Sequence, residues 1–242
     1  MVRARLRAAA LSPVLAFQAM KVISKTPRLP EPEGPRVGRV GSGPDLRVLI
    51  VGDSSAAGVG ADHQLEALSG RLTHALAANF SVSWQLVAKT GMTTRKMPGY
   101  LKKNAQLRFD IAVTALGVND VTRLVAPMTW VAQTNAFHQV LENDFGVRRI
   151  YVTAVPPMAK FPSIPDPLAG FLGDRASLMN AAQQRGLDTH GSARLVDPDW
   201  GFDDTMMASD RFHPGPRLYA RWGSAMARHI LNDLPDGGLG RS

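Results

Sequence analysis

Residues 46–58 read LRVLIVGDSSAAG, and this segment carries the clearest structural signal in the chain. Its first half is a short, almost continuous apolar run rich in β-branched residues, which is typical of a buried parallel strand. The run stops at Gly52, and Asp53 and Ser54 come next. Open α/β sheets bind their ligands at the carboxyl ends of the strands. We therefore expect Ser54 to lie at such an end, where a serine acts as a nucleophile if a base and hydrogen-bond donors are close to it.

Four more apolar runs resemble this one, and stretches with helical periodicity separate them. We expect further strands at residues 82–88, 109–116, 149–155 and 193–196, and helices at residues 62–79, 93–107, 129–145, 168–185 and 217–231. Strands that alternate with helices in this way predict a parallel sheet covered by helices on both faces. The expected fold class is therefore α/β, with a parallel five-stranded sheet.

The composition is that of a globular protein, with 45% hydrophobic and 20% charged residues in a chain of 242. That length suffices for one α/β domain with a complete core. The chain has no cysteine, which excludes disulfides, zinc–thiolate sites and thiol catalysis. Of the net charge of +8, +6 belongs to residues 1–49 and only +2 to the rest. Because the folded domain is nearly neutral, nucleic acid is not an expected partner.

The first 30 residues contain no acidic residue, and arginines at positions 3, 5 and 7 precede a mostly apolar stretch. Three interpretations stay open for residues 1–25: a signal for export, a basic helix on an anionic membrane surface, and a helix packed on the domain. Pro13 and Gln18 interrupt the apolar stretch, which is too short to span a bilayer. The expected location is the cytoplasm, with or without membrane association, and export stays open.

Residues 26–45 contain five prolines and several glycines, a composition typical of an extended connector with no helix or strand of its own. The expected organisation is a basic N-terminal helix and Pro/Gly-rich connector over residues 1–45 and an α/β domain over residues 46–234. Residues 235–242 form the third part, an expected flexible C-terminal tail.

Four loops that follow expected strands carry polar residues able to do chemistry together. Because the strand-end loops of a parallel sheet lie on the same side, Ser54 and the segment with Asp210 and His213 can meet there. A serine hydroxyl needs a base to take its proton, and His213 is the candidate. Asp210, three residues earlier, can accept a hydrogen bond from one ring nitrogen and leave the other facing Ser54.

The loops that follow the first three strands also offer hydrogen-bond donors for a developing oxyanion. These donors are the backbone N–H groups of Ser54 and Gly91 and the side-chain amide of Asn119, which donates without carrying charge. Structural interpretations stand beside these roles: Ser54 as a helix cap, Asn119 with Asp120 as a turn and N-cap, and His213 as a surface histidine. Asp53 is expected to tie loops together rather than to take part in catalysis.

These motifs, in this order, resemble the four sequence blocks of the SGNH (GDSL) hydrolases, a family that includes bacterial-type esterases. The resemblance covers roughly residues 46–232 and implies a flavodoxin-like three-layer α/β/α sandwich and a Ser-His-Asp ester hydrolase. It makes Ser54 the nucleophile, gives the other triad positions to Asp210 and His213, and assigns the oxyanion hole to Ser54, Gly91 and Asn119. Many members have leucine at the position of this chain's Ser55.

The expected function is that of a carboxylic-ester hydrolase acting through an acyl-enzyme on Ser54, with short to medium acyl esters as substrates. Within the same fold the alternatives are a deacetylase or transacylase acting on sugars and a lysophospholipase. An alternative of another class is a non-catalytic flavodoxin-like binding domain. No cofactor or metal is expected, since the remaining histidines lack metal-ligand spacing, and the expected partner is a small-molecule or lipid ester.

Four apolar residues near the expected strand ends are candidates to line the acyl site: Met92, Met158, Phe161 and Trp200. Methionine side chains adapt to irregular shapes, and apolar pockets accept acyl chains. The same residues are equally consistent with ordinary core and lid packing.

Overall fold

A computed structural model of the protein describes residues 2–106, 108–187 and 191–234, so the expected C-terminal tail at 235–242 lies outside the described residues. Within these ranges one six-stranded sheet has the order β1-β3-β2-β4-β5-β6. All neighbouring pairs are parallel except β1 and β3. The strands are β1 (Val37–Val40), β2 (Asp45–Gly52), β3 (Ser81–Ala88), β4 (Ile111–Ala115), β5 (Arg149–Thr153) and β6 (Ala193–Val196).

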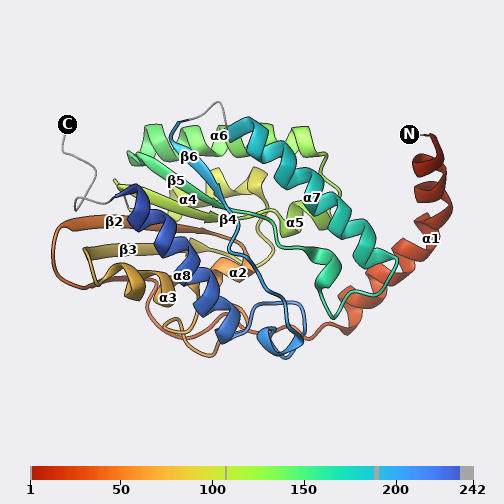
Figure 1. The fold of residues 1–242 in the computed structure, drawn as a ribbon, viewed down its shortest axis with the longest axis horizontal. Coiled ribbons are helices and arrows are strands. Elements are labelled where there is room, and N and C mark those ends of the chain that lie inside the picture. Colours follow the sequence, from red (N-terminus) through yellow and green to blue (C-terminus); the bar gives the residue numbers. More distant parts are fainter. Residues whose placement is uncertain (1, 107, 188–190, 235–242) are drawn as a thin grey trace.

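Helices cover both faces of this sheet (Figure 1). The α-helices are α1 (Val2–Lys25), α2 (Ser54–Ala57), α3 (Leu68–Leu76), α4 (Met97–Asn104), α5 (Val118–Thr122), α6 (Pro127–Phe145), α7 (Leu168–Leu187) and α8 (Pro216–Asp233). Three short 3-10 turns are η1 (Thr94–Lys96), η2 (Met158–Lys160) and η3 (Asp204–Met206). The prediction of a parallel α/β sheet between two helical layers is confirmed.

Strand β2 shows how the sequence builds the two layers. Successive side chains of a strand point to opposite faces. Val48 and Ile50 accordingly lie in a core with residues of α3 and α8, whereas Leu49 and Val51 lie in a second core with residues of α4 and α6. A strand buried on both sides has no polar face, which explains the continuous apolar run in the sequence.

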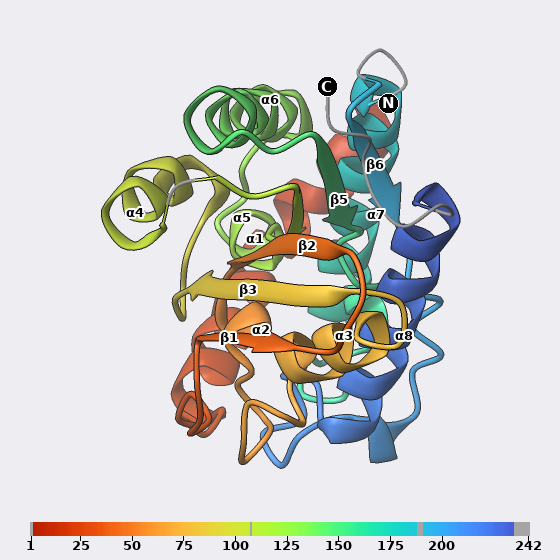
Figure 2. The same ribbon diagram turned by 90° about the vertical axis from the view of Figure 1, so that its left-hand side faces the viewer.

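The connector contains a strand that its composition does not predict, so the sheet has six strands rather than five. Strand β1 pairs antiparallel with β3, with Gly38 opposite Trp84 and Val40 opposite Val82. Figure 2 shows β1 beside β3 at the edge of the sheet. Without β1, strand β3 would expose a row of unpaired backbone N–H and C=O groups, and β1 covers that edge.

The helix expected over residues 62–79 is shorter and begins only at Leu68. The reason is Gln64, whose buried side chain donates to the carbonyl of Ala57 at 2.8 Å and accepts from the Ser69 hydroxyl at 2.8 Å. A buried amide needs such partners, and these hold the preceding residues in turns. Leu65 lies in these turns and is 67% exposed.

The register of the central strands brings three loops together at one edge. Gly52 of β2 lies opposite Ala88 of β3 and opposite Ala115 of β4. The chain leaves β2 toward β3 on one side and later returns to β4 on the other, which makes the end of β2 a topological switch point. A Cβ atom on Gly52 would lie 2.3 Å from the carbonyl oxygen of Ala115, so only glycine fits there.

The C-terminal part of helix α1 lies beside α7, whereas its N-terminal part extends away from the rest of the chain (Figure 1). Leu15, Ala19 and Val22 pack on a third core cluster, which contains residues of α6 and α7. Among the described residues, no helix combines the length and the hydropathy needed to cross a membrane.

Candidate active site

Ser54 is the first residue of α2, directly beyond the end of β2. The preceding Asp53 caps this short helix, because its Oδ1 accepts hydrogen bonds from the Ser55 backbone N–H at 3.0 Å and the Ser55 hydroxyl at 2.7 Å. Asp53 is 2% exposed and Ser54 is 8% exposed. The cap therefore fixes the backbone around Ser54, as expected for a helix N-terminus.

Asp210, His213 and Ser54 form a hydrogen-bonded chain. His213 Nε2 lies 2.9 Å from Ser54 Oγ, and His213 Nδ1 lies 2.6 Å from Asp210 Oδ2. Asp210 Oδ1 also accepts the backbone N–H groups of Phe212 and His213, each at 3.0 Å. The same carboxylate thus closes the turn and holds the imidazole in a fixed orientation.

The charge state of Asp210 determines the direction of these hydrogen bonds. Burial raises the pKa of Asp210, but the hydrogen bonds from the His213 ring and from the two backbone N–H groups outweigh it and hold the pKa below its usual value. The carboxylate is therefore ionised at neutral pH and can only accept. Nδ1 of a neutral His213 then carries the ring proton, and Nε2 is left to accept from Ser54 Oγ.

Asn119 lies in the first turn of α5, at the edge where Ser54 lies. Its Nδ2 donates to Asp53 Oδ2 at 3.1 Å, which leaves the second amide hydrogen free to point elsewhere. Burial raises the pKa of Asp53, and the hydrogen bonds from Ser55 and Asn119 only partly offset this effect. Asp53 thus ties the loops after β2 and β4 together.

Gly91 follows β3 at the same edge. Its φ of +77° lies in the left-handed region, and a Cβ there would meet no heavy atom within 4 Å. Backbone conformation, not crowding, therefore favours glycine at this position. The Gly91 carbonyl accepts from Arg123, at the end of α5, at 3.4 Å.

Asp120, expected to cap a helix, instead lies inside α5 and is fully buried. Its Oδ2 accepts from the backbone N–H of Thr94 at 3.2 Å and from the Thr94 hydroxyl at 3.0 Å. Trp130 Nε1 donates to the same hydroxyl at 2.9 Å. Burial raises the pKa of Asp120 despite the hydrogen bonds from Thr94. Asp120 therefore links α5 to the loop that follows Gly91.

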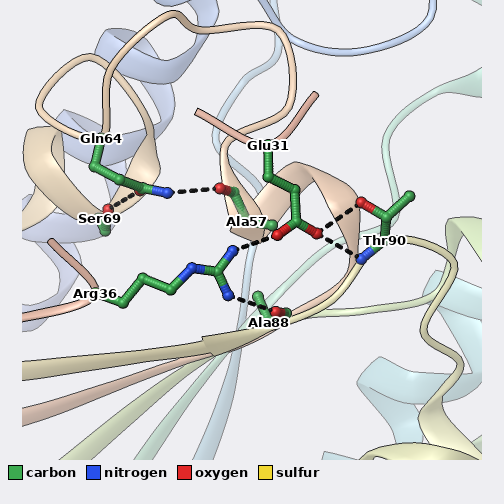
Figure 3. A network of polar contacts seen from close by, with 7 residues as sticks. All are labelled: Glu31, Arg36, Ala57, Gln64, Ser69, Ala88 and Thr90. Carbon is green, nitrogen blue, oxygen red and sulfur yellow. Dashed lines mark hydrogen bonds and ion pairs between the residues drawn. The ribbon is translucent and has the colours of Figure 1, made fainter. Parts of the chain in front are cut away.

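The connector also holds the Gly91 loop (Figure 3). Glu31 Oε1 accepts from the Thr90 backbone N–H at 3.0 Å and from the Thr90 hydroxyl at 2.8 Å. Arg36 pairs with the other carboxylate oxygen at 2.5 Å and donates to the carbonyl of Ala88 at 2.9 Å. We call Glu31, Arg36 and Thr90 the connector clasp. Arg36 joins the connector to the last residue of β3, and Glu31 joins it to the loop that follows β3.

A pocket of about 60 Å³ lies beside Ser54 and His213. Most of its lining is apolar, and Phe161 and Trp200 are part of it, as expected. The other two candidates lie elsewhere: Met92 packs in the core under α4, and Met158 is fully buried in the third cluster. Both therefore fit the alternative of core packing. Phe202 also lines the pocket, in the segment from Trp200 to Met207 that the sequence makes a candidate lining, and Phe212 lines it between the two triad positions. Leu218 and Trp222 of α8 complete the apolar lining, and no sequence pattern singled them out.

Helix α8 is tied to the Ser54 loop by a residue that sequence patterns do not reveal. The buried hydroxyl of Tyr219 donates to the carbonyl of Val59 at 2.8 Å, and the Val59 N–H donates to the carbonyl of Ser54 at 3.0 Å. Since α8 begins just after His213, this contact holds the two parts of the site at a fixed distance. In the part of the chain that the structure describes, no group of His, Asp or Glu residues is arranged to hold a metal ion.

The comparisons with solved structures agree with this geometry at the level of the fold. A carbohydrate esterase family 2 enzyme from Corynascus thermopiles (Myceliophthora fergusii) matches with a TM-score of 0.64 and 18% identity, over 84% of this chain and 69% of that one. The lipase Lip_vut3 from a goat rumen metagenome matches with a TM-score of 0.60 and 19% identity, over 80% and 98%. The aryl esterase of M. smegmatis matches with a TM-score of 0.59 and 16% identity, over 77% and 99%.

A search among curated proteins gives no match. A family model, by contrast, covers most of the chain. The model of the GDSL-like lipase/acylhydrolase family matches residues 50–221, a range that includes the Ser54 loop, the Asn119 turn and the Asp210–His213 segment. With this match, the fold and the hydrogen-bonded Ser-His-Asp arrangement, the chain belongs to the GDSL-like lipase/acylhydrolase family and is an ester hydrolase.

Proposed function

We propose that this ester hydrolase acts on carboxylic esters through an acyl-enzyme on Ser54. The observation that carries the proposal is the hydrogen-bonded chain from Ser54 Oγ through His213 to Asp210. Ser54 Oγ attacks the ester carbonyl carbon while His213 Nε2 takes the hydroxyl proton. The Asp210 carboxylate stabilises the imidazolium that forms, and His213 then gives the proton to the leaving alcohol.

The oxyanion formed in this step needs donors that are already in place. We assign this role to the backbone N–H groups of Ser54 and Gly91 and to one amide hydrogen of Asn119. The other amide hydrogen of Asn119 is donated to Asp53. Water then attacks the acyl-enzyme, with His213 as base, and releases the acid. Deacylation breaks the bond between Ser54 Oγ and the acyl carbon, His213 passes the proton taken from water to Ser54 Oγ, and the enzyme returns to its starting state.

The pocket supports short acyl groups as substrates. A volume of about 60 Å³ holds only a few non-hydrogen atoms, and the aromatic lining matches an apolar acyl group. This size fits an acetyl or slightly longer acyl chain better than the long chain of a lysophospholipid.

A second candidate is the removal of acetyl groups from acetylated sugars. The small pocket favours it, and two matching solved structures are named as a carbohydrate esterase and a carbohydrate acetylesterase. Release of acetate from an acetylated sugar at a rate similar to that from simple acetate esters would support this substrate. A much slower release would leave simple esters as the substrate class.

The proposed mechanism is tested by Ser54→Ala. Removing the nucleophile lowers kcat for a p-nitrophenyl acetate substrate by about 10⁴-fold or more. It also abolishes labelling by a fluorophosphonate, which reacts with activated serines. Ser177→Ala, at an exposed serine of α7, is the matched control and leaves both unchanged. Retained turnover in purified Ser54→Ala would contradict the acyl-enzyme mechanism, and an unlabelled parent chain would favour a binding domain.

A further inference from the structure

Helix α1 has two faces with different roles. Leu15, Ala19 and Val22 face the third core cluster. Between them, Gln18 makes two hydrogen bonds: its Nε2 donates to the carbonyl of Asp166 at 2.7 Å, and its Oε1 accepts from the Leu168 N–H at 3.1 Å. Leu168 begins α7, so Gln18 satisfies a backbone donor that has no partner within that helix. This explains a polar residue in an apolar stretch.

The opposite face of α1 exposes four large apolar side chains beside Lys21 and Ser24. Val14, Phe17, Met20 and Ile23 are 45%, 63%, 62% and 75% exposed. We call these four residues the outer stripe. At 100° per residue, Phe17 and Met20 lie on the side away from Leu15, Ala19 and Val22, and Val14 and Ile23 lie at the two edges of that side. A helix that faces water has the reverse arrangement, with polar residues outside.

The N-terminal segment that carries the outer stripe has charges of one sign. Residues 1–30 contain six Lys/Arg and no Asp or Glu. Lys21 and Lys25 are exposed on the same helix, next to the stripe. An apolar stripe bordered by basic residues suits a phospholipid surface that carries negative charge, where acyl chains accept the apolar side chains and headgroups attract the cations. A second copy of this chain would bring the same positive charge and would be repelled.

We propose that the outer stripe of α1 docks the protein on an anionic phospholipid surface, with α1 lying in the plane of the interface. The attachment of α1 then orients the domain. Gln18 holds Asp166, and the same loop carries Phe161, which lines the pocket beside Ser54. The docked helix therefore lies next to the loop that carries one wall of the acyl pocket. This inference is independent of the proposed ester chemistry.

The test is sedimentation of the full chain with vesicles of phosphatidylcholine, with and without phosphatidylglycerol. The parent protein sediments with vesicles that contain phosphatidylglycerol, and added salt weakens this binding. The double variant Phe17→Ser/Met20→Ser lowers the partition coefficient by about tenfold or more, because it removes apolar area from the interface. The matched control is Leu65→Ser/Met128→Ser, at side chains that are 67% and 70% exposed elsewhere, and it binds like the parent.

Hydrolysis of a soluble acetate ester, or a cooperative thermal transition if no hydrolysis occurs, shows that each variant is folded. Failure of the parent to sediment with anionic vesicles would overturn the proposal, as would equal binding to phosphatidylcholine alone. Equal binding by the stripe variant and its control would overturn it as well. A dimer of the parent that the stripe substitutions dissociate, seen by analytical ultracentrifugation, would assign the stripe to a second copy instead.

Discussion

Ser54 and His213 lie 159 residues apart in the chain, and two short turns bring their side chains to 2.9 Å. Asp53 holds one turn by capping α2, and Asp210 holds the other by accepting three hydrogen bonds. Asp53 therefore positions Ser54, and Asp210 positions His213. The two differ in electrostatics, since the pKa of Asp210 is lowered by its donors whereas that of Asp53 is raised by burial.

Asn119→Ala tests the oxyanion hole at the residue scale. The variant loses an uncharged donor that acts on the developing negative charge, so we expect kcat to fall by about 10²- to 10³-fold with little change in KM. Stopped-flow or steady-state assays with a p-nitrophenyl ester measure this. Since the variant also leaves Asp53 Oδ2 without its donor, thermal unfolding must be followed alongside. A rise in KM with unchanged kcat would contradict the assignment.

Phe161→Ala tests the size of the acyl pocket. Phe161 contacts Phe202 and Phe212 with ring-centroid distances of 5.5 and 5.3 Å, and together they close the pocket. Removing the ring enlarges the site, so the ratio of kcat/KM for octanoate over acetate esters rises by about tenfold or more. An acyl-chain-length series measures this, and an unchanged ratio would show that the acyl group lies elsewhere.

At the scale of elements, the connector does more than link α1 to the domain. It supplies β1 to the sheet edge, and its Glu31 holds Thr90, the residue before Gly91. Loops with few contacts of their own depend on such hydrogen bonds for a fixed geometry. The connector clasp is therefore placed to control the direction of the Gly91 N–H.

Glu31→Ala frees Thr90, and we expect kcat to fall by about tenfold while KM changes little, because a misdirected donor acts mainly on the transition state. Glu31→Gln keeps an acceptor for Thr90 and restores most of kcat. The matched control is Arg39→Ala, which breaks an exposed pair with Asp45 at 2.7 Å on the same connector, away from Gly91. Equal losses of kcat in Glu31→Ala and Arg39→Ala would show a general loss of structure instead.

At the scale of the whole molecule, buried carboxylates act on stability in opposite directions. Asp210 has a lowered pKa, so its ionised form stabilises the fold above the usual pKa of about 3.9, and this contribution is lost as the pH falls through the lowered value. Asp120 has a raised pKa, so its ionisation costs stability. That cost is absent below about pH 4 and complete once the pH exceeds the raised value.

Asp120→Asn removes this pH-dependent cost, and its carbonyl oxygen can still accept from Thr94. We therefore expect the free energy of unfolding of the variant, relative to the parent, to increase as the pH rises from about 4 to 7. Urea titrations at several pH values measure the difference. A difference that stays constant across this range would show that Asp120 has the same pKa in the folded and the unfolded chain.

The sequence by itself determined the α/β class, the five parallel strands and the identity of the residues that meet beyond them. These are local properties: the apolar periodicity of each segment and the residue that follows each strand are fixed by the residues themselves. The helix expected over residues 62–79 is shorter because the buried side chain of Gln64 forms hydrogen bonds with Ala57 and Ser69.

Only the tertiary structure decided which residues contact which. It added β1 to the sheet, put Met92 and Met158 into the core rather than the pocket, and joined Tyr219 to the Ser54 loop and Glu31 to the Gly91 loop. It also showed that the polar Gln18 faces inward on α1 while the apolar stripe faces outward. Such contacts depend on strand register and on partners far away in the chain, and no local pattern encodes them.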